Sequence, residues 1–445
     1  MPHFEFAASI ALASCTLASG AAFLLNRPKE GKIKLPVQVE DGVDSALDPF
    51  DVAVPEDFVD GYPIEEDVFW NQVGRRKYTL SFLAATIFIL QSLRLGLSLK
   101  DSLGITTSLV GNALDVYYAF FLLALCVRSL KHRNVSAHSE SVLHISALTV
   151  ISALLLTTLA ILPTTSSPAL RHILPATLYL RYTVIALYIA SSFIALSTPQ
   201  GPPLHYPPSA IYLPKTVESI TNMDKENVTG ADSSSPWGYL MFSYTTKVVM
   251  LGNIAQSLEI GDLPILPANM RSVLNFSRIR KVAQTVKFWS AKPGSGWNVG
   301  YQLLRVNFGV LTAQFWLAVV SAVLFYLPPW FLNLLVKYLQ SDPERRDRSW
   351  GWVYVFGLII ATALMHLVSA QLWSISTTVI ETRFKIQLNS LLYAKTLVRK
   401  DAVSSSGPST KSDEEDGAGE DEKDDENDFS TKAQIMTLMT TDTDR

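Results

Sequence analysis

Residues 236–267, PWGYLMFSYTTKVVMLGNIAQSLEIGDLPILP, decide how the rest of the sequence is divided. The stretch is too polar to cross a bilayer, because it contains Lys247, Glu259 and Asp262 and ends among prolines. It is also too rich in aromatic and aliphatic residues to be a free linker. We therefore expect it to lie along a membrane-embedded helix bundle on the aqueous side.

Apolar spans lie on both sides of this stretch, and each is near or above the roughly 20 residues that a helix needs to cross the hydrocarbon core. Five precede it and two follow it, at 4–25, 79–99, 105–127, 142–162, 173–196, 308–339 and 351–380. The composition agrees, since 48% of residues are hydrophobic and only 17% are charged, against about 25% charged in soluble domains. The sequence predicts an all-α, multi-pass membrane protein.

The spans divide the chain into three parts. Residues 1–196 form a predicted five-helix N-terminal transmembrane domain, 197–306 a cytoplasmic linker, and 307–445 a second membrane domain that begins with two helices. The first span could instead be a signal peptide, but no positive charge precedes it, which favours a retained anchor. Residues 35–74 have many acidic residues and prolines and no Lys or Arg, which is typical of a solvated loop.

Basic residues predict the orientation of the chain in the membrane. With the N-terminus outside or lumenal, the inner segments hold 29 of the 37 Lys and Arg residues and the outer segments hold five. Because cytoplasmic loops are enriched in Lys and Arg, the N-terminus is predicted outside and the C-terminus in the cytoplasm. The vacuolar and the plasma membrane both fit this orientation.

Catalytic and cofactor motifs are missing from the sequence. It contains no G-x-x-x-x-G-K-[ST] loop to cradle phosphates, its seven histidines lack metal-ligand spacing, and no nucleophile–base pair is visible. Both cysteines fall inside apolar spans, which predicts packing rather than disulfide or metal chemistry. We expect no cofactor, no metal and no nucleic-acid partner for this chain.

Polar and aromatic residues in the last two spans could line a pathway for amphipathic molecules. They are Gln314, Trp316, Trp330, Asn333, His366, Gln371 and Trp373. For any one of them, ordinary packing or an interfacial aromatic is the better interpretation, whereas as a group they fit the wall of a large cavity. Asp115 and Arg181, in the third and fifth spans, could form a pair, either as a structural clamp or as a functional site.

Two charged segments remain. Residues 271–292 are basic and amphipathic, which is typical of docking on anionic lipid headgroups or of a linker helix that packs on the bundle. Residues 381–400 have apolar residues at helical spacing and should continue the seventh span into the cytoplasm. The acidic insertion 401–430 interrupts that helix, as a disordered segment or as a regulatory arm.

Three motifs resemble the C-subfamily of ABC transporters, the multidrug-resistance-associated group, in a fungal-type form. The order of an aromatic Ser/Thr patch, a short amphipathic run and E-x-x-D-L-P (Glu259, Asp262, Leu263, Pro264) resembles that family's lasso linker. Residues 327–339, LPPWFLNLLVKYL, resemble its first core helix. The segment 431–445 is similar to its first intracellular coupling loop, with matches at Ile435, Leu438, Met439 and Asp442.

The resemblance implies a membrane-spanning N-terminal portion of an ATP-driven exporter of amphipathic or organic-anion substrates. The first two helices of a type-1 transmembrane domain would be present, and 431–445 would dock on a nucleotide-binding domain of the same full-length chain. ATP and Mg²⁺ are expected only for that full-length protein. Anionic-conjugate specificity is not implied, because 318–325 reads AVVSAVLF where family members that export such conjugates carry a Lys and a His.

Two functions from other classes stay open. A non-catalytic membrane scaffold or trafficking module would use the N-terminal domain and the linker alone, and a stable native product ending near residue 445 would favour it. A seven-helix receptor fits the span count and the orientation, but its fifth and sixth spans are separated by 197–306. A ligand-dependent G-protein response would favour the receptor.

Overall fold

The structure is a computed structural model that describes most of the chain, and 85% of the described residues are helical. The described residues are 2–25, 59–101, 107–131, 133–161, 175–212, 214, 217, 226–255, 257–258, 260–285, 296–341 and 348–398. The prediction of an all-α membrane protein is confirmed at the level of class. Seven helical stretches within these residues are long and apolar enough to cross a bilayer.

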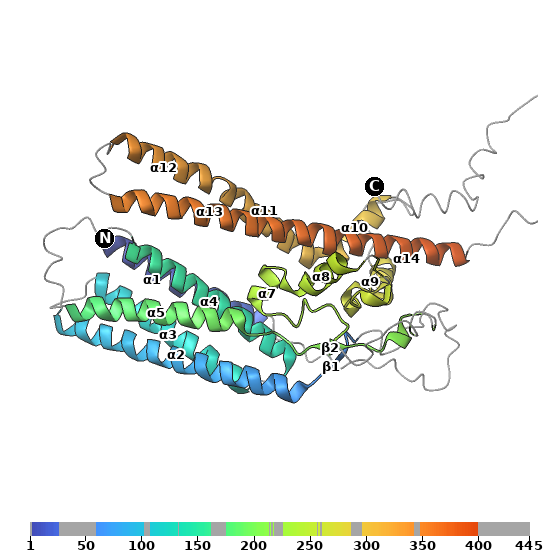
Figure 1. Cartoon of the computed structure of the whole chain (residues 1–445), viewed down its shortest axis with the longest axis horizontal. Helices are drawn as coiled ribbons and strands as arrows, with labels where there is room; N and C mark the ends of the chain where they lie inside the picture. Colours follow the sequence, from blue (N-terminus) through green and yellow to red (C-terminus); the bar gives the residue numbers. More distant parts are fainter. Residues whose placement is uncertain are drawn as a thin grey trace, which may run out of the picture. The chain divides into compact units, whose positions relative to one another are not determined.

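The first five of these stretches are single helices (Figure 1). They are α1 (Pro2–Leu25), α2 (Glu66–Asp101), α3 (Thr107–Lys131), α4 (Val135–Ile161) and α5 (Pro175–Ser197). The α1 helix packs on α3 and α4, and its Leu12 is buried in their core. The α1 helix is therefore an integral part of the core of this bundle.

The sixth and seventh stretches are compound. The sixth joins α11 (Phe308–Phe325) to α12 (Leu327–Ser341), and the break at Tyr326 precedes Pro328 and Pro329. A proline lacks the backbone N–H that would continue a helix but is accepted in a first turn. The seventh runs from α13 (Arg348–Ser374) through a π-helical segment, η7 (Ile375–Glu381), into α14 (Thr382–Val398). The predicted continuation of the seventh span as a helix is confirmed as far as residue 398.

The α2 helix begins earlier than expected. Residues 66–74 were predicted as part of a loop, and this is wrong, because they form the first turns of α2. Glu66 and Asp67 lie in the first turn, where carboxylates favour the helix dipole. Trp70 Nε1 also donates a hydrogen bond to Glu66 Oε1 over 2.9 Å. The sequence pattern did not indicate the start of α2 at residue 66. The exposed side chains of these first turns include acidic residues, and only Phe69 and Val73 are buried.

The chain separates into two compact units. The first contains 61–265 and 327–363 together with the N-terminal residues to 38, and the second contains 39–60, 266–326 and 364–445. The predicted linker is therefore divided at residue 265 between the two units. Each unit is described on its own below.

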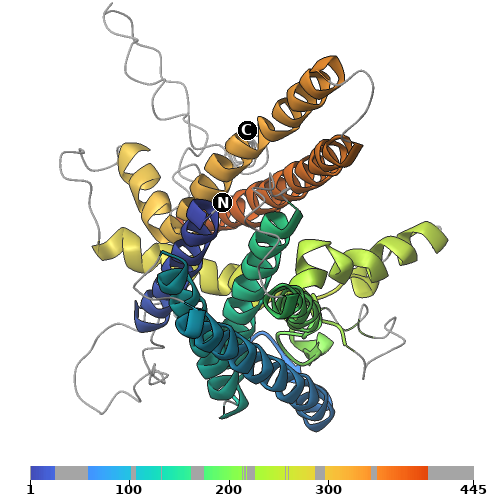
Figure 2. The same cartoon turned by 90° about the vertical axis from the view of Figure 1, so that its left-hand side faces the viewer.

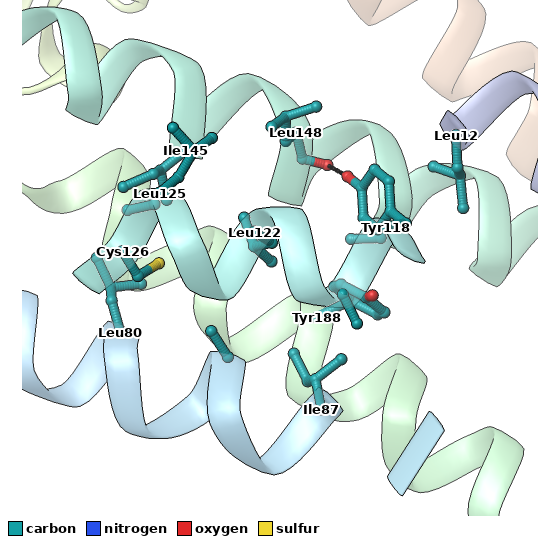
Figure 3. Close-up of a cluster of buried hydrophobic side chains, with 14 of the residues drawn as sticks. Leu12, Leu80, Ile87, Tyr118, Leu122, Leu125, Cys126, Ile145, Leu148 and Tyr188 are labelled. Carbon is teal, nitrogen blue, oxygen red and sulfur yellow. Dashed lines mark hydrogen bonds between the residues drawn. The ribbon is translucent and has the colours of Figure 1, made fainter. Parts of the chain in front are cut away.

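The core of the first unit lies between α1, α2, α3, α4 and α5, which Figures 1 and 2 show side by side. Figure 3 shows Tyr118 and Tyr188 facing each other among aliphatic side chains such as Leu122 and Ile87. The Tyr118 hydroxyl donates to the Leu148 carbonyl over 2.6 Å. This bond satisfies a polar group that burial would otherwise leave without water.

Short elements make up the linker. In the first unit, β1 (Tyr62–Pro63) pairs antiparallel with β2 (Leu204–His205), and η3 (Pro208–Ala210), α7 (Pro236–Leu240), η4 (Ser243–Thr245), α8 (Thr246–Ile254) and η5 (Ile260–Asp262) follow. In the second unit, η6 (Ala268–Met270), α9 (Ser272–Thr285) and α10 (Gly296–Val306) lead into α11. The α9 helix packs on α10 and α14.

Candidate functional site

The start of the linker is held against the end of the five-helix bundle. The Pro199 carbonyl accepts a hydrogen bond of 3.0 Å from His138 Nε2, and Ser139 Oγ donates to the Gln200 side chain over 3.0 Å. Arg76 donates to the Ser197 carbonyl. These bonds come from α2 and α4, so the exit of α5 is fixed by its two neighbours.

Lys77 and His138 are buried beside this exit. Lys77 Nζ donates to the Ser129 carbonyl over 2.9 Å and lies 5.5 Å from the centre of the Trp70 ring. The Trp70 ring is in turn 5.6 Å from the His138 ring. A buried ammonium group is tolerated when it is hydrogen-bonded and faces an aromatic ring. The cluster gives the linker a rigid base.

Beyond this base, the linker closes on itself around Asn227. The Tyr206 N–H donates to Asn227 Oδ1 over 2.8 Å, and Asn227 Nδ2 donates back to the Tyr206 carbonyl over 2.7 Å. Val228 and Ile265 form a parallel β-bridge, in which Ile265 N donates to the Asn227 carbonyl over 2.7 Å. The first and last parts of the segment 204–265 thus meet, and their side chains form a small apolar cluster of their own.

This closed segment borders an open hollow of about 860 Å³. Its lining combines serines and threonines with the Lys247–Glu226 ion pair, whose atoms are 2.7 Å apart, and with Tyr244. Burial raises the pKa of Tyr244 and of Tyr239, and the Asp232 charge raises that of Tyr239 further. The hollow therefore has a mixed wall, in which polar side chains and a neutral phenol alternate with aliphatic side chains such as Val248 and Leu263.

Three of the four residues of the E-x-x-D-L-P motif line this hollow. They are Asp262, Leu263 and Pro264, at the end of the closed segment just before the bridge at Ile265. Glu259 lies outside the described residues. The motif therefore stands where the chain turns back toward Asn227, so its proline and aspartate belong to the closure of the loop.

In the second unit, three buried amides join the linker to the last helix. Gln387 Nε2 on α14 donates to Asn275 Oδ1 on α9 over 3.1 Å, and Asn307 Nδ2 donates to Gln387 Oε1 over 2.8 Å. Asn275 Nδ2 also donates to the Asn269 and Arg271 carbonyls. All three side chains are at least 96% buried. We call these residues the amide network.

The amide network makes α9, the entry to α11 and α14 one packed body. Buried polar groups that are satisfied in this way fix one arrangement of helices, because a shifted helix would leave them unpaired. Ile279 of α9 is fully buried, whereas Arg280 lies 5.8 Å from the Phe276 ring. The apolar face of α9 is thus packed within the protein, while 286–292 of the basic stretch lie outside the described residues, and lipid docking by the stretch stays a prediction.

The seven candidate pathway residues are dispersed over three helices. Trp316 on α11 and Trp373 on α13 are exposed, as are Trp330 and Asn333 on α12 and His366 on α13. Gln314 is half-buried, and Gln371 is buried one turn before the π-helical segment. The hollow in the linker and the cavity within the five-helix bundle are lined by other residues.

Asp115 and Arg181 line the same cavity, and a third charged residue, Arg94, lines it with them. Arg94 Nη1 forms an ion pair of 3.7 Å with Asp115 Oδ2, and Arg181 is on the wall of the same cavity. The coupling residues Ile435, Leu438, Met439 and Asp442, and the acidic insertion 401–430, lie outside the described residues. Among those that are described, no group of three or more His, Cys, Asp or Glu residues could hold a metal ion.

No family model matches this chain, and no curated protein matches it either. Its function is consequently inferred from the geometry above and from the motifs in the sequence.

Sequence reasoning missed the amide network and the Lys77–His138 cluster. In the sequence, Asn275 is only a polar position of the basic stretch 271–292, and Gln387 is only a polar position within the amphipathic stretch 381–400. A polar residue on the otherwise apolar face of a helix is the signal that such a network leaves in sequence. The partners of Gln387 are Asn307 and Asn275, which are 80 and 112 residues away in the sequence. Sequence spacing does not identify pairs that are so distant.

Proposed function

We propose that this chain is the membrane-spanning N-terminal portion of an ATP-driven ABC exporter of the C-subfamily type. Its substrates are amphipathic or organic-anion molecules that cross the membrane through the domain that α11 begins. In this proposal, α1 to α5 are the N-terminal membrane domain, 197–306 is the lasso linker, and α11 to α14 open the type-1 domain. The N-terminus is outside or lumenal, in the vacuolar or plasma membrane.

The observation that carries the proposal is the closed form of the linker. A segment between membrane helices is commonly a simple connector, but residues 204–265 fold back on themselves through Asn227 and the Val228–Ile265 bridge. Asp262, Leu263 and Pro264 of the E-x-x-D-L-P motif lie next to that closure, which supports the lasso interpretation. The amide network then ties the second part of the linker to α14, the helix that leads toward the proposed coupling segment 431–445.

ATP and Mg²⁺ have no place among the residues of this chain. The sequence has no phosphate-cradling loop with its Lys, and such a loop supplies the backbone N–H groups that hold phosphates. The proposal assigns both to nucleotide-binding domains of a longer product, which contact Ile435, Leu438 and Met439. In the proposed exporter, this chain encloses the substrate and transmits movement through α14.

The genomic reading frame tests this proposal first. We expect it to continue past codon 445 into four further membrane helices and a G-x-x-x-x-G-K-[ST] motif. Purified residues 1–445 should show no saturable ATP binding after contaminating ATPases have been removed. A frame that closes near codon 445, with a stable native product of that length, would contradict the exporter.

A scaffold function is favoured by one observation, the self-contained packing of the first five helices. Their buried core includes residues from all five and needs no other part of the chain. A membrane domain with its own core can fold and recruit partners independently. Expression of residues 1–265 alone separates the two functions. A scaffold would still recruit its partners, whereas an exporter would no longer transport its substrate.

A further inference from the structure

Two arginines meet on the packed pair of helices α9 and α14 (Figure 1). Arg383 precedes Gln387 by one turn of α14, and Arg278 follows Asn275 by three residues on α9. Because Gln387 and Asn275 are hydrogen-bonded, the two arginines occupy the next layer of the same contact. There their positive charges repel each other. We call Arg278 and Arg383 the arginine pair.

Neither member of the arginine pair has a carboxylate partner among the described residues. Arg278 is exposed, whereas Arg383 is half-buried and its Nε atom is enclosed without a hydrogen-bond partner in that part of the chain. The described residues of the second unit include two carboxylates, and both are engaged. Asp60 accepts a backbone hydrogen bond of 2.7 Å, and Glu381 forms an ion pair of 3.0 Å with a lysine one turn along. Two adjacent positive charges are costly where they are partly desolvated and no opposite charge accompanies them.

The second unit as a whole has an excess of positive charge. Its described residues carry eight Lys and Arg side chains against those two carboxylates. Arg280 and Lys281 lie on α9 next to the arginine pair. Several like charges at short range produce a potential that attracts an oppositely charged chain. A polyanion would therefore be held here by more than one charge at once.

The same chain contains a polyanion. Residues 413–428 have eleven Asp and Glu residues and one Lys, and they follow α14, the helix that carries Arg383. From Arg383 to the end of α14 at Val398 is 15 residues, which is about 22 Å along a helix. The 14 residues 399–412 reach up to about 45 Å when extended. The acidic segment is thus tethered within reach of the arginine pair.

We propose that residues 413–428 dock on the arginine pair of α9 and α14 and supply its missing negative charge. The tether keeps this segment at a high local concentration, an advantage that a soluble anionic partner lacks. Contacts between carboxylates and guanidinium groups are charge-assisted and can be bidentate. Because Gln387 of the amide network lies one turn from Arg383, the docked segment also restrains α14 against α9. This docking is independent of the exporter proposal, because it involves only residues of this chain.

Double electron–electron resonance on the full chain in detergent tests the docking. One spin label is placed at Tyr393→Cys, an exposed position of α14, and the other at Gly419→Cys in the acidic segment. Cys15 and Cys126 are replaced by alanine in all variants, so that only these two positions react. We expect one narrow distance distribution in this parent.

Reversing the charge of the arginine pair should release the segment. In Arg278→Glu/Arg383→Glu the distribution should become about twofold wider or more, because a tethered chain without its docking site samples its whole reach. The matched control is Arg75→Glu, an exposed position of α2, which should keep the narrow distribution. Changing the acidic residues of 413–416 and 420–422 to Lys in the charge-reversed variant should restore the narrow distribution, which a merely structural role of the arginines would not do.

A change in the acidic segment alone keeps the test decisive if Arg383→Glu does not fold. Replacing the eleven acidic residues of 413–428 by Asn and Gln leaves every described side chain unchanged, and the distribution should widen as in the charge-reversed variant. Salt at about 1 M should have the same effect on the parent, since it screens exposed charges. A distribution that stays narrow in the neutralised variant would overturn the proposal.

Two other anionic occupants give different results. If the acidic residues of 40–57 occupied the arginine pair, a label at Leu47→Cys would show the narrow, arginine-dependent distance to α14, and the label at 419 would not. If an anionic lipid headgroup occupied it, native mass spectrometry in phosphatidylglycerol nanodiscs would show a lipid retained by the parent and lost in the charge-reversed variant, while the label at 419 gave a broad distribution. Either result would overturn the docking of 413–428.

Discussion

Tyr118 combines packing and hydrogen bonding in one side chain of the five-helix core. Its ring is almost fully buried and its hydroxyl donates to the Leu148 carbonyl of α4 (Figure 3). Tyr118→Phe keeps the ring but leaves that carbonyl without this donor, so we expect the free energy of unfolding to fall by about 1 kcal/mol.

Tyr117→Phe is the matched control for this prediction. The Tyr117 side chain is 44% exposed, so loss of its hydroxyl should change the free energy of unfolding by less than about 0.5 kcal/mol. Reversible unfolding in mixed detergent, followed by tryptophan fluorescence, measures both variants. Equal losses would mean that the Tyr118 bond does not support the core.

Gln387 is the residue through which the amide network depends on α14. Gln387→Leu has a similar size but removes the partner of Asn275 Oδ1 and a partner of Asn307 Nδ2. Leaving buried amide atoms unsatisfied should lower the free energy of unfolding by about 1–3 kcal/mol. Gln340→Leu, at an exposed position of α12, should have little effect in the same denaturation experiment, and a comparable loss there would show that the network is not what stabilises α14.

At the scale of single elements, two glycines of α13, Gly351 and Gly357, face aromatic side chains of α12. A Cβ atom on Gly357 would overlap the Phe331 ring. We therefore expect Gly357→Ala to lower the unfolding temperature and Phe331→Leu to restore part of the loss in the double variant. Gly309→Ala in α11 meets no neighbouring atom within 4 Å and should be neutral or stabilising, because Ala favours helix over Gly.

Sequence patterns predicted some elements well and others poorly, for identifiable reasons. Membrane spans can be predicted from sequence because a run of about 20 apolar residues is typical of helices that cross a bilayer. Each of the seven predicted spans corresponds to a long apolar helical stretch in the structure. The first turns of α2 were missed because most of their side chains are polar and exposed. The closure at Asn227 was missed because an asparagine that pairs with a distant backbone, as it does with Tyr206, leaves no periodic signal.

The candidate site was partly predictable. The E-x-x-D-L-P motif identified the region of the hollow, and Asp115 with Arg181 identified the cavity that both residues line in the five-helix bundle. Arg94 was not connected with them, because two residues 21 positions apart on different helices share no sequence period. The pathway residues were chosen by type alone, and type does not determine which face of a helix meets a cavity.

At the scale of the whole molecule, the distribution of basic residues predicts the orientation. Cysteine probes at positions 225 and 415, in the linker and in the acidic insertion, should remain unlabelled by an impermeant maleimide in intact cells. They should become labelled once the membrane is permeabilised. Labelling of either probe in intact cells would contradict the predicted topology.

The central claim, that this chain belongs to an ATP-driven exporter, is tested most directly by transport in vesicles. Vesicles that contain the protein encoded by the complete reading frame should accumulate a fluorescent amphipathic substrate only when ATP is present. Leu438→Asp should abolish accumulation while substrate binding is kept, because it places a carboxylate in an apolar contact with the nucleotide-binding domain. Thr443→Asp, off that face, should transport like the parent. ATP-independent accumulation, or unchanged transport by Leu438→Asp, would contradict the claim.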